Sequence, residues 1–114
     1  MAAPGNRNSR VENRIGEPAA NPYLYIASQV LAGLDGIERQ LRAPDPVERP
    51  YDSDAPALPK TLLEAIESLS GSAFHRAQLG DPFVDYITRI KRAEWDRYLA
   101  AVSEWEEREY LSLF

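Results

Sequence analysis

The 114-residue sequence contains no cysteine, which excludes disulfide bonds and thiolate metal sites. It also lacks any apolar run near the roughly 20 residues that span a bilayer, and its first ten residues lack the hydrophobic region of a signal peptide. Cationic side chains are few: 13 Lys and Arg face 18 Asp and Glu, for a net charge of -5. Nucleic-acid binders need such side chains to neutralise phosphates. We therefore expect a cytoplasmic protein that binds neither membranes nor nucleic acids.

The composition is that of one small soluble domain, with 44% hydrophobic and 27% charged residues. Its first segment differs from the rest, because residues 1–21 carry Arg7, Arg10 and Arg14 against Glu12 and Glu17. This segment is cationic within an acidic chain. An anionic ligand is therefore expected here first.

The N-terminal segment 1–9 has no periodicity and is predicted to be irregular. Residues 10–15 alternate, with Arg10, Glu12 and Arg14 expected on one side and apolar or neutral residues on the other, which predicts a short strand. A turn is expected over 16–20.

A helix is predicted over 21–42, where Asn21 supplies the N-cap and Pro22 the first helical residue. Gly33 and Gly36 each weaken this helix by about 1 kcal/mol relative to Ala, which suggests close packing or a bend. The helix carries one apolar stripe, formed by Tyr23, Ile26, Val30, Leu34, Ile37 and Leu41.

Five prolines make 43–59 an extended loop, which normally lies along another surface. Thr61 and Glu64 match a capping box and begin a helix over 61–70. A short helix over 72–79 and a long helix over 81–110 follow. In the long helix, Asp85 and Arg89 are spaced as an i,i+4 ion pair.

The predicted fold class is mostly α, with one short N-terminal strand followed by about four helices, the last one long. The strand has no partner in this sequence, although its backbone groups need one. We therefore interpret the chain as a fragment of a larger α+β domain.

The side chains of Arg10, Glu12 and Arg14 suit phosphoryl transfer, which uses fixed cations on the transferring oxygens and a carboxylate on a divalent metal. Spacing alone favours a plainer interpretation. Alternating charges are common on strands and usually form solvated ion pairs that contribute little.

Three blocks together resemble the glutamine synthetase family in order and spacing, and the resemblance continues more loosely to the C-terminus. It covers roughly the last quarter of a full-length ligase. The blocks are Arg10-Val11-Glu12-Asn13-Arg14, Ala19-Ala20-Asn21-Pro22-Tyr23-Leu24 and Ala32-Gly33-Leu34-Asp35-Gly36-Ile37.

The resemblance implies the C-terminal part of an ATP-dependent catalytic domain that joins glutamate to ammonia or an amine. It implies that Glu12 is a ligand of Mg²⁺ or Mn²⁺. It implies that Arg10 contacts the nucleotide phosphates, and that Arg14 is the catalytic residue that engages the γ-phosphate and the glutamate carboxylate. The complete protein is expected to be a homo-oligomer.

The family's other metal ligands, its metal-binding His and its ATP-binding loops lie upstream and have no counterpart here. We therefore expect the chain alone to be inactive and to bind no cofactor tightly. His75 is expected to be a packed or surface residue rather than a ligand. Two alternatives remain: a non-catalytic helical interaction module derived from the ligase, and a truncated gene product.

Overall fold

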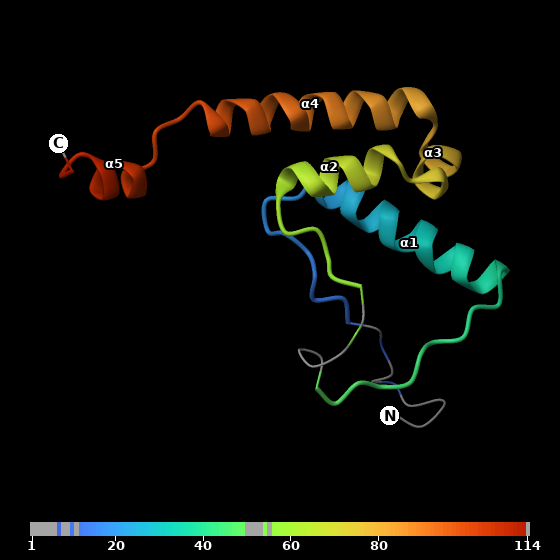
Figure 1. Cartoon of the computed structure of the whole chain (residues 1–114). Coiled ribbons are helices and arrows are strands. Elements are labelled where there is room, and N and C mark those ends of the chain that lie inside the picture. Colours follow the sequence, from blue (N-terminus) through green and yellow to red (C-terminus); the bar gives the residue numbers. More distant parts are fainter. Residues whose placement is uncertain (1–6, 8–9, 11, 50–53, 55, 114) are drawn as a thin grey trace. The chain divides into compact units, whose positions relative to one another are not determined.

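A computed structural model of the chain describes residues 7, 10, 12–49, 54 and 56–113. Most of the predicted irregular segment 1–9, and residues 50–53 and 55 of the predicted loop, lie outside this part. The described residues form five helices and no strand, so the mostly helical class is confirmed. In chain order the helices are α1 (Pro22–Glu38), α2 (Leu62–Ser70), α3 (Ala73–Leu79), α4 (Asp81–Leu99) and α5 (Glu104–Tyr110) (Figure 1).

The prediction of a strand over 10–15 is wrong for residues 10 and 12–15, which the structure describes as irregular. A strand needs a neighbouring strand to accept and donate its backbone hydrogen bonds, and none is formed in the described part of the chain. The backbone amide of Ile15 instead donates to the side-chain Oδ1 of Asn13 at 3.0 Å. Such a local hydrogen bond competes with the backbone hydrogen bonds between strands and turns the backbone.

The chain divides into two compact units, residues 1–46 and 47–114. The first contains α1, which begins where Asn21 Oδ1 accepts hydrogen bonds from the amides of Tyr23 and Leu24, at 3.0 and 3.3 Å. The helix was predicted to reach residue 42 but ends at Glu38. Gln40 causes this, because its φ of 50° lies in the left-handed region.

The apolar stripe predicted on α1 is exposed. No residue of α1 is buried, and Tyr23 and Ile37 are 83% and 76% exposed. Close packing at the glycines is also not observed, since a Cβ at Gly33 or Gly36 would meet no atom within 4 Å in the described structure. The stripe therefore forms no core within the described part of the first unit.

The second unit has its small core between α2 and α4, which pack against each other, while α3 packs against α4 (Figure 1). Ile66 of α2 and Val84 of α4 are the buried residues of the described structure, at 3% and 1% exposure. Thr61 caps α2 as predicted, accepting from the amide of Glu64 at 3.2 Å. The Glu64 carboxylate accepts from the amide of Lys60, at 2.7 Å.

Arg76 of α3 joins this helix to α2 and α4. Its guanidinium donates to the carbonyl oxygen of Ser70 at 2.6 Å, to Asp81 at 2.7 Å and to Asp85 at 2.9 Å. Hydrogen bonds to Asp81 and then Asp85 are the main reasons why the pKa of Arg76 is raised. The predicted pair of Asp85 with Arg89 is replaced by this arrangement.

The long helix predicted over 81–110 is not continuous. It is α4 and α5, separated by residues 100–103. Ser103 and Glu106 form a capping box that begins a new helix: Ser103 Oγ accepts from the amide of Glu106 at 3.2 Å, and the Glu106 carboxylate accepts from the amide of Ser103 at 2.7 Å. No described helix is long and apolar enough to cross a membrane.

Candidate functional site

The predicted site residues lie on the extended segment before α1. Glu12 and Arg14 form an ion pair, with 3.5 Å between Arg14 Nε and Glu12 Oε1. Their side chains are 84% (Arg14) and 63% (Glu12) exposed, so the pair contributes little to stability. Arg10 is exposed and makes no ion pair or hydrogen bond with the other residues that the structure describes. The structure therefore brings together two of the three predicted residues.

Asn13, between Glu12 and Arg14, uses both ends of its side-chain amide. Its Nδ2 donates to Oε1 of Gln29 at 2.6 Å, and its Oδ1 accepts from the backbone of Ile15. Gln29 belongs to α1, so this bond joins the site segment to the helix. Sequence reasoning missed both residues, because no motif marks a pair of neutral amides that lie 16 residues apart.

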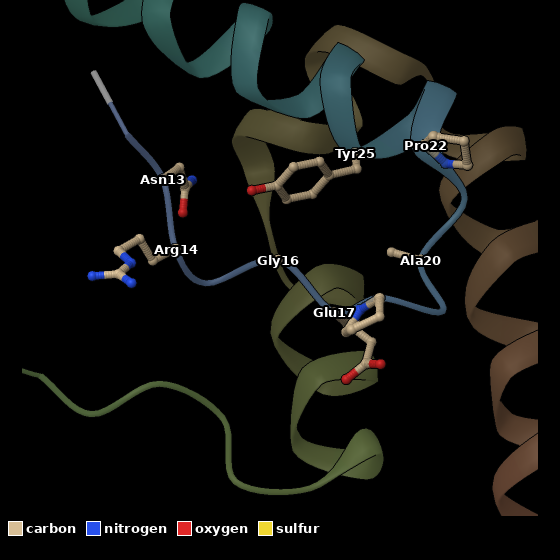
Figure 2. A pocket seen from close by; sticks show the side chains of 8 residues that line it. Asn13, Arg14, Gly16, Glu17, Ala20, Pro22 and Tyr25 are labelled. Atoms are coloured by element: carbon tan, nitrogen blue, oxygen red, sulfur yellow. The ribbon is translucent and has the colours of Figure 1, made fainter. Parts of the chain in front are cut away.

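A shallow cavity of about 350 Å³ lies beside Arg14. It is lined by six residues of the segment 13–20 together with Pro22 and Tyr25. Figure 2 shows the Tyr25 ring reaching from α1 toward this segment, while Arg14 points away from the ring. The cavity walls are thus formed entirely by the first unit.

The turn that closes the cavity is held by Glu17. Its carbonyl oxygen accepts from the amide of Ala20 at 3.0 Å, and its carboxylate accepts from the amide of Ala19 at 3.2 Å. The Glu17 carboxylate therefore has a structural role in this turn. Arg14 is the one cation among the residues that line the cavity.

The guanidinium of Arg14 can bind a phosphate or a carboxylate through two donors at once. Its exposure leaves that capacity available to a ligand. The arrangement is therefore suited to holding an anionic group. Arg14, Glu17 and Tyr25 are the titratable residues that line the cavity, and the Glu17 carboxylate also accepts a hydrogen bond within the turn.

A divalent metal needs several ligands, and Mg²⁺ is rarely held by one carboxylate. Among the described residues, no group of three or more His, Cys, Asp or Glu side chains is placed to hold a metal ion. Glu12 could supply one ligand, but the described residues do not fit a complete metal site.

His75 lies in the second unit and is half-buried, consistent with the expected packed or surface residue. Its ring Nδ1 lies 2.8 Å from Ser72 Oγ, and its backbone amide donates to the same oxygen at 3.3 Å. Ser72 is the N-cap of α3. His75 therefore supports a helix start.

Three relatives illustrate what the chain is similar to. It is 43% identical to a gamma-glutamylanilide synthase from Acinetobacter, with 99% of this chain and 25% of the relative covered. It is 41% identical to a gamma-glutamylethanolamide synthetase from Streptomyces coelicolor, over 90% of this chain and 22% of the relative. It is 34% identical to a glutamine synthetase from Methanococcus maripaludis, over 99% of this chain and 27% of the relative.

The chain thus spans about a quarter of the length of the curated relatives that it matches. Residues 1–110 match the family described as "Glutamine synthetase, catalytic domain". This match covers nearly the whole sequence, including the exposed Glu12–Arg14 pair and the cavity beside it. The chain belongs to the glutamine synthetase family, within its catalytic domain.

Proposed function

We propose that this chain is the C-terminal part of an ATP-dependent glutamine synthetase-type ligase and that Arg10, Glu12 and Arg14 face its active site. The observation that carries the proposal is the exposed Glu12–Arg14 pair, beside a cavity, in a chain of this family. In the second unit, by contrast, Arg76 is paired with two carboxylates of this chain, those of Asp81 and Asp85.

The proposed reaction has two steps. The γ-phosphoryl group of ATP is transferred to a γ-carboxylate oxygen of glutamate, which releases ADP and forms an acyl phosphate. The nitrogen of ammonia or an amine then attacks the acyl carbon, phosphate leaves, and the nitrogen loses a proton. Arg10 would bind the nucleotide phosphates. Arg14 would bind the transferring phosphoryl group and the substrate carboxylate.

Mg²⁺ or Mn²⁺, when bound in the complete protein, neutralises charge on the phosphate oxygens. We propose that Glu12 supplies one carboxylate to such an ion and that the other ligands come from residues outside this chain. The chain alone is therefore expected neither to hydrolyse ATP nor to form a γ-glutamyl product. The complete protein is expected to be a homo-oligomer.

We further propose an amine as the nitrogen donor. The two relatives whose names give an amide of an amine as the product are 43% and 41% identical to this chain, whereas the Methanococcus maripaludis glutamine synthetase is 34% identical. Initial rates of the complete protein with ammonia, aniline and ethanolamine at equal concentrations distinguish the donors. A higher kcat/KM for ammonia would overturn this part of the proposal.

The role of Glu12 is tested in the complete protein with Glu12→Gln, which keeps the shape and removes the charge. Turnover should fall by about 100-fold or more, because a metal ligand matters at least as much as the groups that support it. Glu38→Gln is the matched control and should keep turnover, since Glu38 is exposed at the end of α1 and does not line the cavity. Full turnover in Glu12→Gln would remove Glu12 from the site.

A second candidate is a non-catalytic helical module that binds a protein partner. The exposed stripe of α1 favours it, as do Val102, Trp105 and Leu111 around α5, which are 72%, 57% and 77% exposed. Such surfaces often bind partners. Size-exclusion chromatography with light scattering provides the test: a stable monomer without self-association would count against this candidate.

A further inference from the structure

The segment that carries Arg14 is attached to one face of α1 at two points. Tyr25 and Gln29 are four residues apart on the helix, so their side chains lie on the same face. Gln29 contacts Asn13, directly before Arg14, and Tyr25 contacts Gly16, two residues after it. Arg14 therefore lies between two attachment points, both within the first unit (Figure 2).

The first attachment point is the amide of Asn13. Because one end donates to Gln29 Oε1 and the other accepts from the Ile15 amide, the position of the amide is determined at both ends. These bonds restrain the backbone on each side of Arg14. Its exposed guanidinium has no comparable restraint, apart from the ion pair with Glu12.

The second attachment point is the contact between Gly16 and the ring of Tyr25. A Cβ added at Gly16 would lie 3.1 Å from both Cζ and Oη of Tyr25. That distance is shorter than an ordinary van der Waals contact, so a side chain at Gly16 would displace the ring or the segment. Tyr25 is half-buried, whereas Tyr23, on the same turn of α1, is 83% exposed.

We propose that Gln29 and Tyr25 are positioning residues that hold Arg14 where it binds the anionic group of the substrate. They do not touch the substrate themselves. Their effect reaches it through the backbone of residues 13–16. This inference rests on the proposed function for the role of Arg14, but the attachment of the segment to α1 can be measured separately.

The attachment is measured by NMR on the 114-residue chain. Nuclear Overhauser effects are expected between the Gly16 α-protons and the Tyr25 ring, together with slowed exchange of the Asn13 side-chain amide. Gln29→Leu should abolish the slowed exchange, whereas Gln29→Glu should keep it, because a carboxylate also accepts a hydrogen bond. Gln78→Leu, at an exposed position of α3, is the control and should change neither signal.

The positioning role is measured in the complete protein. Gln29→Leu should lower kcat/KM for glutamate about fivefold, the ratio that one neutral hydrogen bond supports, and Gln29→Glu should restore it. In an Arg14→Ala background, Gln29→Leu should have no further effect. If Gln29 has only a structural role, Gln29→Leu should lower kcat/KM by the same factor with Arg14 and with Arg14→Ala.

The possible outcomes separate the two proposals. If Arg14→Ala keeps full turnover, the proposed role of Arg14 fails and so does positioning, whatever the NMR signals show. If Arg14→Ala strongly lowers kcat/KM while Gln29→Leu and Gly16→Ala leave it unchanged, only the positioning role fails. Absence of the Gly16–Tyr25 effect in the unmodified chain would overturn the attachment itself.

Discussion

The core of the second unit is so small that one substitution should remove much of its stability. Ile66→Ala deletes three carbons from a side chain that is 3% exposed and that lies between α2 and α4. At about 0.8 kcal/mol per buried methylene, the transfer term is roughly 2.4 kcal/mol. The cavity adds to this and the higher helix propensity of Ala offsets a few tenths. The net expected loss is about 2–3 kcal/mol.

The matched control is Ile90→Ala, because Ile90 lies on α4 and is 44% exposed. Its expected cost is below about 1 kcal/mol, since it buries less surface. Urea unfolding of the 114-residue chain, followed by circular dichroism at 222 nm, gives both values. Equal losses for the two variants would show that packing in this unit is not centred on Ile66 and Val84.

Two further perturbations follow from the described helices. Gly33→Ala should stabilise α1 by about 1 kcal/mol, because the added Cβ meets no atom within 4 Å and Ala favours helix; a loss of helicity by circular dichroism would contradict this. Hydrogen bonds from the backbone and side chain of Ser103 lower the pKa of Glu106 below about 4.5, its ordinary value. The stabilisation that Glu106 gives to the start of α5 should therefore be fully present above that pH and be lost as pH falls through the lowered pKa. Glu106→Gln should remove this pH dependence, and amide exchange at Ser103 is the readout.

Local signals predicted much of the helical structure. The cap at Asn21 and the proline after it mark the start of α1, and Thr61 marks the start of α2, because each supplies an oxygen to free amides within three residues. The end of α1 could not be predicted in this way. Gln40 adopts the left-handed conformation that glycine usually occupies, and a glutamine at this position does not indicate that conformation.

The break between α4 and α5 was visible in the sequence but was missed. Ser103 and Glu106 have the spacing of a capping box, yet i,i+4 ion-pair spacings on both sides of Ser103, such as Arg92 to Asp96 and Glu104 to Arg108, favour one long helix. Contacts between residues far apart in the sequence could not be predicted from these local patterns. Asp85 has two possible arginine partners, and only the fold brings Arg76 closer than Arg89.

The candidate site was predicted in part. The family resemblance, added to the alternation of charges, singled out Glu12 and Arg14, which the structure pairs. The alternation also predicted a strand that the described residues do not form. Strand formation depends on a neighbouring chain segment, which a local pattern does not contain. The contacts of Asn13 and Gly16 with α1 were missed for the same reason, since they join residues far apart in sequence.

The role of the cationic segment in phosphoryl transfer can be tested by positional isotope exchange. The complete protein is incubated with ATP labelled at its β,γ-bridging oxygen and with glutamate, in the absence of ammonia or amine. We predict glutamate-dependent movement of the label to a non-bridging position, and its loss in Arg14→Ala. Exchange at the unmodified rate in Arg14→Ala would contradict the assignment of this segment to the site of phosphoryl transfer.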